Sequence, residues 1–223
     1  MSGAGERAVV VAECSVLGPA VMIALEADGW AVTTTDMEGA ADTCAAVGPH
    51  ALVQVAGPAA HGDEGPVEGV GQLVAVAELC RRSPLAPAAA GTDAGTTAGA
   101  THALRSIVLV AGAGSEPGAA TGVDAAVITG GLVGLVQGLA RELGPAAVTA
   151  NLVVPGLVDD GHGSAVGFQD QEWVARLVRA TPIRRLVTPQ EVAATVSFLC
   201  SAAAAYVSGT VWPVSGGLGM GAR

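Results

Sequence analysis

The sequence predicts an α/β fold built on a doubly wound parallel sheet with helices on both faces. Two observations carry this prediction. The runs at residues 8–11 and 51–55 are short and continuously apolar, as strands buried on both faces of a sheet are. Helical segments separate such runs along the chain, and strands that alternate with helices form parallel sheets through right-handed crossovers.

The composition agrees with a folded protein that buries much of its surface. The chain has 223 residues, of which 51% are hydrophobic and 13% are charged, against about 25% charged residues in an average globular protein. The length suits one domain over residues 1–223. Buried parallel strands or a large subunit interface would bury the excess of apolar residues.

Strand and helix signals alternate through the first half of the chain. Gly18 and Pro19 open a helix that Gly29 closes, because proline is tolerated in a first helical turn and glycine favours a helix end. The predicted strands cover residues 8–11, 30–35 and 51–55, and the predicted helices cover 18–28, 40–46 and 69–82. Residues 83–100 are rich in Pro, Ala, Gly and Thr, which predicts a surface loop or a weak helix.

The second half continues the alternation. The predicted strands cover residues 106–111, 148–154 and 210–214, and the predicted helices cover 124–143, 169–179 and 189–204. The start of the last helix is well marked. Thr188 can cap it, Pro189 takes the first helical position, and Glu191 completes a capping box.

Charge and cysteine usage exclude several classes of protein. Acidic residues outnumber basic ones 20 to 10 and every basic residue is an arginine, so we expect no nucleic-acid partner. The apolar stretch at residues 8–25 contains Glu13 and lacks a basic leader, so we expect neither a signal peptide nor a membrane span. The four cysteines form no disulfide or ligand pattern, which predicts a reduced, cytoplasmic protein without a metal site.

Three stretches of the second half resemble the short-chain dehydrogenase/reductase (SDR) family. They read GLVGLVQGLARELGP (131–145), TANLVVPG (149–156) and TPIRRLVTPQEVAATVSFLCSAAAAYVSGTVWPVSGG (181–217). They are similar to the helix after the family's catalytic Tyr-Lys pair, to its strand ending in Pro-Gly and to its C-terminal run ending in Gly-Gly. A weaker match, VQVAG (53–57), lies where the family has a strand ending in Asn-Asn-Ala-Gly. The resemblance implies a Rossmann-like sheet and hydride transfer to or from a nicotinamide, with a Ser-Tyr-Lys-Asn tetrad at the site.

The catalytic positions that the resemblance implies hold other residues. The family's Lys falls on Thr129, its Tyr on Ala125 and its Ser on Gly112, while its Asn falls on Glu68 or near Pro84. A tyrosine has a pKa near 10 and is a poor base at neutral pH without a neighbouring cation, and this chain contains no lysine. We therefore expect no catalytic residue at these positions.

The cofactor turn that the resemblance implies also departs from the family pattern. Of the glycines that let the backbone approach a pyrophosphate, only Gly18 remains, while Glu13 and Val16 would place a carboxylate and a branched side chain there. Asp36 remains at the position that binds ribose hydroxyls, although it also reads as an ordinary solvated strand end. Only 15 positions separate Asp36 from Ala51, too few for two crossovers and an edge strand. We expect a truncated cofactor half without that edge strand and no cofactor on this chain.

Two further groups of residues suggest a role. Gly130, Gly134 and Gly138 form a small-residue stripe on the predicted helix at 124–143, and glycine costs about 1 kcal/mol relative to alanine inside a helix. We expect the stripe to lie in a subunit interface, as the equivalent helix does in the family; packing on the chain's own sheet is the alternative. Asp159, Asp160 and His162 could serve acid–base chemistry, or lie in a solvated loop that Gly161 and Gly163 make flexible.

Taken together, these departures predict a non-catalytic SDR-fold subunit. We expect it to assemble with an active SDR paralogue, as a heterotetramer in which the partner holds NAD(P). The resemblance extends to heteromeric alcohol dehydrogenases with one inactive subunit, such as 2-[hydroxy(phenyl)methyl]succinyl-CoA dehydrogenase. The alternative is an SDR-fold enzyme that performs redox-neutral cyclisation or dehydration without a nicotinamide.

Overall fold

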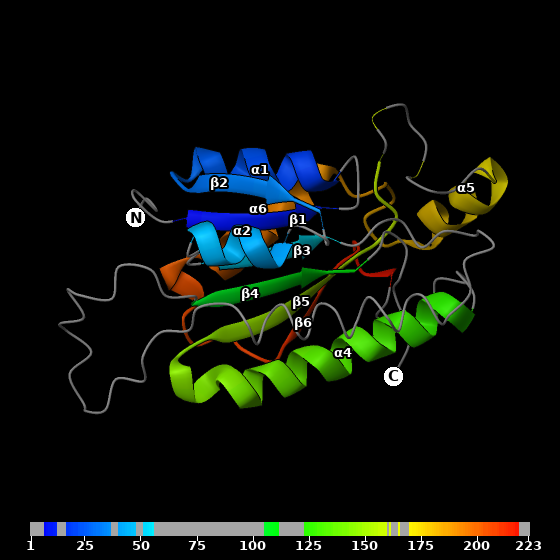
Figure 1. Ribbon diagram of the computed structural model, residues 1–223. Helices are drawn as coiled ribbons and strands as arrows, with labels where there is room; N and C mark the ends of the chain where they lie inside the picture. Colours follow the sequence, from blue (N-terminus) through cyan, green and yellow to red (C-terminus); the bar gives the residue numbers. More distant parts are fainter. Residues whose placement is uncertain are drawn as a thin grey trace.

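Six parallel strands form one sheet in the computed structural model, in the order β2-β1-β3-β4-β5-β6 (Figure 1). The strands are β1 (Arg7–Ala12), β2 (Ala31–Thr35), β3 (Ala51–Val55), β4 (Ser106–Val110), β5 (Thr149–Pro155) and β6 (Val211–Val214). The structure describes residues 7–12, 17–36, 40–47, 51–55, 105–111, 123–159, 161, 165 and 170–218. The chain passes from β1 to β2 on one side and returns to β3 on the other, so the predicted doubly wound sheet is confirmed.

Helices cover both faces of this sheet. They are α1 (Leu17–Ala27), α2 (Ala40–Val47), α4 (Val123–Leu143), α5 (Gln171–Ala180) and α6 (Pro189–Cys200), with short 3-10 turns η1 (Gly144–Ala146) and η2 (Ala202–Ala204). The helices α1 and α6 pack on one face, and α2 and α4 pack on the other. The helix α5 lies beyond the carboxyl ends of the strands (Figure 1).

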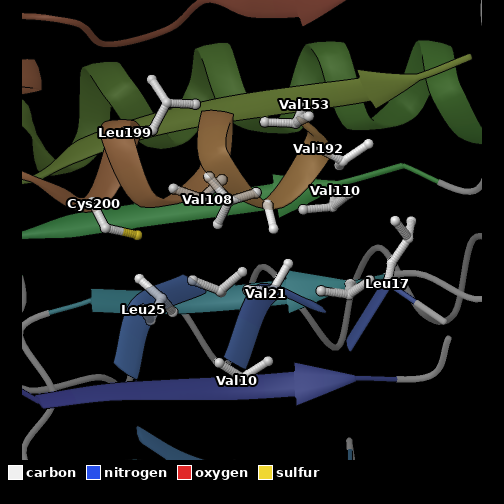
Figure 2. Close-up of a cluster of buried hydrophobic side chains, with 14 of the residues drawn as sticks. Val10, Leu17, Val21, Leu25, Val108, Val110, Val153, Val192, Leu199 and Cys200 are labelled. Atoms are coloured by element: carbon white, nitrogen blue, oxygen red, sulfur yellow. The ribbon is translucent and has the colours of Figure 1, made fainter. Parts of the chain in front are cut away.

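Successive residues of β1 enter different cores. Ala8 and Val10 are fully buried against α1 and α6, whereas Val9 is fully buried in the cluster that includes α4. Figure 2 shows the first cluster, with Leu17, Val21 and Leu25 of α1 on the same face of the sheet as Val192 and Leu199 of α6. A strand that buries both faces needs apolar residues at every position, which is why these strands read as continuous runs in the sequence.

A buried asparagine joins β5 to the segment that leads into β6. The Asn151 side chain is completely buried, and its Nδ2 donates to the Val207 carbonyl oxygen at 2.8 Å. Its Oδ1 accepts from the Thr210 hydroxyl at 2.8 Å, and the Trp212 indole N–H donates to that hydroxyl at 2.6 Å. Because a buried amide needs all these partners, Asn151 fixes where β6 begins.

The described elements lie where the sequence predicts them, with small shifts at their ends. The largest shift concerns the last helix, predicted to reach Ala204: the α-helix ends at Cys200, and after the extended Ser201 the chain continues as η2. The capping box is confirmed, since Thr188 accepts from the Glu191 N–H and the Glu191 side chain accepts from the Thr188 N–H. The helix predicted at 69–82 and the loop at 83–100 lie outside the described residues.

On one side, the described sheet ends at β2. The residues of β2 are all exposed or half-buried, as an edge strand's are, whereas β3, β4 and β5 are buried throughout. The short connection from Asp36 to Ala51 holds α2. Within the described residues, the sheet therefore lacks a further strand beyond β2, as the spacing predicts.

Candidate functional site

The strand order defines where a ligand would bind. In open α/β sheets, ligands bind outside the carboxyl ends of the strands, at the point where the strand order reverses. Here the reversal lies between β1 and β3, whose last residues are Ala12 and Val55. The candidate site is therefore this edge of the sheet, flanked by the carboxyl ends of β2, β4 and β5.

Two features of this edge suit a dinucleotide. The helix α1 begins at Leu17 shortly after β1 ends, and the N–H groups of a first helical turn carry a partial positive charge that favours phosphate. Gly18 is buried in that turn. Asp36 follows the end of β2 at the same edge and is exposed, as a carboxylate that meets ribose hydroxyls must be. Glu13 and Val16 lie outside the described residues.

Gly156 holds the ends of β5 and β6 together. Its N–H donates to the Val214 carbonyl oxygen at 3.0 Å, and a Cβ on Gly156 would lie 3.0 Å from the Ser215 Cα. Any other residue would crowd the Ser215 backbone, which would have to shift by a few tenths of an ångström. The chain then continues through Leu157 to Asp159, where Val187 donates to the Leu157 carbonyl oxygen at 3.0 Å and accepts from the Asp159 N–H at 2.9 Å.

A tight turn packs against the end of β6. Gly216 has φ +64°, and a Cβ there would lie 2.9 Å from the Thr181 Cγ2, so glycine is required for two reasons. The Ile183 N–H donates to the Gly216 carbonyl oxygen at 3.3 Å, and the Arg184 N–H donates to that of Thr181 at 2.9 Å. Arg184 itself has φ +64°, a backbone angle that residues other than glycine rarely adopt.

An ion pair borders a pocket of about 280 Å³ beside this turn. The Arg185 guanidinium donates to both carboxylate oxygens of Glu191, at 2.6 and 2.7 Å. These hydrogen bonds, together with that from the Thr188 N–H, lower the pKa of Glu191 to about 2. The other pocket walls are mostly apolar and include Ile183, Leu186, Val187, Trp212 and Val214.

The positions at which the resemblance places the catalytic residues lie on α4 or outside the described residues. Thr129 is 5% exposed and faces the protein interior, and Ala125 precedes it by four residues on the same helix, so the expected spacing is kept. Gly112 is outside the described residues. The chain's single tyrosine, Tyr206, is fully exposed before β6 begins, at the opposite edge of the sheet from the candidate site.

The glycine stripe lies on the outer face of α4. Gly130, Gly134 and Gly138 are exposed, and a Cβ at any of them would meet no described atom within 4 Å. The residues of α4 that pack on the sheet are Leu132, Val136, Leu139 and Leu143. Packing of the stripe on the chain's own sheet, the alternative considered from the sequence, is therefore wrong, and the interface stays a prediction.

The acidic loop supplies no acid–base pair within the described residues. The Asp159 carboxylate accepts from the Gly161 N–H at 2.9 Å, whereas His162 lies outside the described residues. The part of the chain that the structure describes contains no group of His, Cys, Asp and Glu side chains that could hold a metal ion. Among the described helices, only α4 has the length and apolar composition to span a membrane, and its leucines pack on the sheet instead.

Sequence reasoning did not assign the contacts that shape the site's rim. The close approach of Gly156 to Ser215, and of Gly216 to Thr181, joins segments about 30 to 60 residues apart. The available signal was the pair of motifs Pro155-Gly156 and Gly216-Gly217, which indicates tight backbone approach without identifying the partner.

Comparisons with known proteins identify the family to which the chain is related. A family model described as enoyl-(acyl carrier protein) reductase matches residues 87–219. The chain is 45% identical over 91 residues to the 3-oxoacyl-[acyl-carrier-protein] reductase MabA of Mycobacterium tuberculosis, covering 41% of this chain and 36% of that protein. It is 40% identical over 90 residues to the 3-oxoacyl-[acyl-carrier-protein] reductase FabG of Pseudomonas aeruginosa, covering 40% of this chain and 35% of that protein. The matched part thus spans about a third of these relatives' length.

Solved structures match along the whole chain. A gluconate 5-dehydrogenase from Burkholderia cenocepacia, in complex with NADP and tartrate, has a TM-score of 0.71 at 19% identity and covers 100% of this chain and 98% of its own. The ligand-free aldohexose dehydrogenase of Thermoplasma acidophilum has a TM-score of 0.68 at 18% identity, and the match covers 96% of this chain and 94% of that one. At these identities, the likeness shows the fold.

These comparisons correct the functional expectations drawn from the sequence. The expectation of a non-catalytic subunit that is not an enzyme is contradicted, because the relatives are named as reductases. The expectation that this chain binds no cofactor is contradicted by a structure of the same fold that holds NADP, and the nicotinamide-free alternative is contradicted with it. In this fold a dinucleotide is held largely by backbone groups and a helix end, so altered side chains at the turn are a weak sign that binding is lost.

The family itself rests on agreement between sequence and fold. The family model covers more than half of the chain, and the strand order and flanking helices agree with the solved structures. The chain belongs to the short-chain dehydrogenase/reductase family, in the group described as enoyl-(acyl carrier protein) reductase.

Proposed function

We propose that this chain is a nicotinamide-nucleotide-dependent oxidoreductase that reduces the carbonyl group of a 3-oxoacyl thioester. The observation that carries the proposal is the reversal of strand order between β1 and β3, with the start of α1 and Asp36 at the same edge of the sheet. The substrate class comes from the relatives named as 3-oxoacyl-[acyl-carrier-protein] reductases. We expect the protein to act in the cytoplasm.

The chain's own residues suit the cofactor. The first turn of α1 would face the pyrophosphate, and Asp36 would accept hydrogen bonds from ribose hydroxyls. A carboxylate at this position repels a 2′-phosphate, so the proposal favours NADH over NADPH. The cofactor supplies the hydride when bound; the protein orients the carbonyl against it and limits access of water.

The proton donor must differ from the family's Tyr-Lys pair. The chain contains no lysine, and Tyr206 lies at the far edge of the sheet. A positioned general acid contributes about 10²–10⁴-fold to such a rate. Because positions Ala125 and Thr129 lack one, we expect slow turnover with the proton supplied by solvent.

Assembly with another chain of the same fold belongs to the proposal. The exposed stripe at Gly130, Gly134 and Gly138 allows a second helix to approach α4 closely, and burial there would offset the helix destabilisation by glycine.

The test measures binding and turnover separately. Titration calorimetry with NADH and NADPH should show micromolar binding that favours NADH, and Asp36→Ser should reduce that preference. Oxidation of NADH with an acetoacetyl thioester, followed by its absorbance, should be slow but depend on enzyme concentration. Asp42→Ser, at an exposed acidic position on α2, is the matched control. If neither NADH nor NADPH binds, the proposal is refuted.

A further inference from the structure

We propose that the outer edge of β2 accepts one further strand, contributed by an extended, basic segment of another protein. The described sheet ends at β2 (Ala31–Thr35), because the edge strand that the SDR resemblance implies beyond it is missing from the described residues. A strand in this position directs part of its N–H and C=O groups away from the sheet, where another strand can pair with them. This docking site goes beyond the proposed function and does not depend on it.

The outer edge of β2 lacks the features that usually prevent pairing. Natural edge strands are protected by proline, by charged side chains or by bulges. The strand reads AVTTT, without proline or charge, and its register with β1 runs unbroken from Arg7–Ala31 to Val11–Thr35. The edge strand on the other side of the sheet, β6, contains Pro213, which has no N–H to donate. Of the two edges of the described sheet, β2 is therefore the one open to pairing.

The charge around β2 indicates which kind of segment would pair with it. Ten of the 20 acidic residues and none of the basic residues lie in residues 8–80, so this part of the chain carries the whole net charge of −10. Its described carboxylates lie before and after β2 along the chain: Glu26 and Asp28 precede the strand, Asp36 and Asp42 follow it, and all four are exposed. The helices α1 and α2, which carry Glu26 and Asp42, both contact β2. A basic partner is therefore complementary in charge.

These charges are not neutralised within the described fold. No described residue forms an ion pair with Glu26, Asp28 or Asp42. The Asp28 carboxylate accepts a hydrogen bond from the Ser197 hydroxyl, which is a neutral donor and leaves the negative charge in place. The described residues contain no group of acidic side chains that could hold a metal ion. The complementary cations are therefore expected on an extended molecule.

The length of β2 sets the length of the segment. Its five residues span about 16 Å, at about 3.3 Å per residue. A segment with about five uncharged residues between basic ones would lie along β2 and bring its cations close to the carboxylates at the two ends of the strand. In strand addition of this kind, the main-chain hydrogen bonds provide affinity and the side chains provide specificity.

A second copy of this chain fits the same edge less well. Antiparallel pairing centred on Thr33 would place Asp36 of one copy opposite Trp30 of the other, close to Asp28. Like charges that face each other across two strands weaken the pair. The charge therefore favours a basic segment over a copy of β2.

The first experiment measures binding of a designed peptide. A fluorescently labelled peptide with lysines on both sides of five alternating Val and Thr residues is titrated with the full chain, and anisotropy is recorded at ionic strengths of about 0.01 M and 0.1 M. The peptide should bind, and more weakly at the higher ionic strength. Two control peptides, one with glutamates in place of the lysines and one N-methylated at each Val and Thr, should bind at least about tenfold more weakly, since they lack the charge and the backbone donors.

Hydrogen exchange measured by mass spectrometry locates the bound peptide. Saturating peptide should slow amide exchange in β2 about tenfold and leave β6 unchanged, because pairing protects the amides that point away from the sheet. Unchanged exchange in β2, or no binding of the lysine peptide, would overturn the proposal. If raising the protein concentration without peptide slows exchange in β2 as much, the occupant is a second copy and the choice of a basic segment is overturned.

Charge reversal tests the complementarity. Glu26→Lys/Asp42→Lys should weaken binding of the lysine peptide about tenfold or more at the lower ionic strength. Glu142→Lys/Glu172→Lys makes the same change in net charge at exposed positions on α4 and α5, and this control should bind like the wild type. Melting curves verify that both variants fold. Equal binding by the first variant and the control would overturn the assignment of the site to β2.

Discussion

The two halves of the sheet are held by different kinds of contact. Around β1, the helix α1 packs on α6 through apolar side chains, with one polar link from the Ser197 hydroxyl to the Asp28 carboxylate. Around β5 and β6, polar and steric requirements are added to the apolar packing: the Asn151 hydrogen bonds, the Thr188–Glu191 capping box, and the glycines against Ser215 and Thr181. Many apolar residues can fill a buried position, whereas few can meet those requirements.

This difference explains where the family resemblance is visible. The motifs at 131–217 include the residues with special requirements, so they remain readable in one sequence. The cofactor site proposed for the first half would bind through backbone geometry and a helix end, and such a site constrains few side chains. Its altered residues therefore suggested a loss of function that the comparisons contradict.

The largest expected effect comes from completing the catalytic set. If the first half holds the cofactor, Gly112→Ser/Ala125→Tyr/Thr129→Lys should raise the NADH-dependent rate by about 10²–10⁴-fold, since it supplies a positioned acid and a cation that lowers its pKa. Steady-state kinetics at saturating NADH measures this.

The control moves two substitutions by one position. Gly112→Ser/Ala126→Tyr/Gly130→Lys places the new groups on exposed positions of α4, and its rate should match the wild type. An unchanged rate in the first variant would show that the cofactor half does not position the nicotinamide.

The apolar half should depend most on buried volume. Leu25 is fully buried between α1 and the sheet, so Leu25→Ala should lower the free energy of unfolding by about 2–5 kcal/mol. Ile23 lies on the same helix and is 66% exposed, so Ile23→Ala should change the free energy of unfolding by less than about 0.5 kcal/mol. Chemical denaturation measures both, and equal effects would contradict the assigned burial.

The polar half should depend on satisfied hydrogen bonds. Asn151→Ala leaves the Val207 carbonyl and the Thr210 hydroxyl without their partner, which should cost about 1–3 kcal/mol. The change should also raise amide hydrogen exchange at the start of β6. Mass spectrometry measures this exchange. If β6 of the Asn151→Ala variant exchanges as slowly as that of the wild type, Asn151 does not fix where β6 begins.

The capping box should make a smaller, pH-dependent contribution. Thr188→Ala removes the cap and should cost about 1 kcal/mol at neutral pH. The folded-state pKa of Glu191 is lowered to about 2 by Arg185 and Thr188, so its contribution is complete above about 4.5 and is lost as the pH falls toward 2. Melting temperatures across that window should fall more steeply for the wild type than for Glu191→Gln.

The smallest effect on stability is expected at the glycine stripe. Gly134→Leu adds a side chain at an exposed position with no described neighbour, and leucine favours a helix more than glycine does. The melting temperature should hold or rise slightly. If α4 contacts another chain, the same change should reduce the apparent mass in size-exclusion chromatography. Ile23→Leu, at an exposed position of α1, is the control. An unchanged mass for Gly134→Leu would remove the interface prediction.

The sequence by itself determined the sheet, the alternation of helices and the caps, because each rests on local periodicity or on a pattern of adjacent residues. The apolar run at 51–55, the Thr188 cap and the short connection after Asp36 all have the structure that they predict. The catalytic positions could be located on α4 for the same reason, by their four-residue spacing.

Only the tertiary structure decided which distant residues meet. It places the glycine stripe outside the core and brings Gly216 against Thr181. Spacing along a helix says which residues share a face, but the facing partner depends on how strands far apart in the chain are ordered. That order is a property of the packed sheet as a whole.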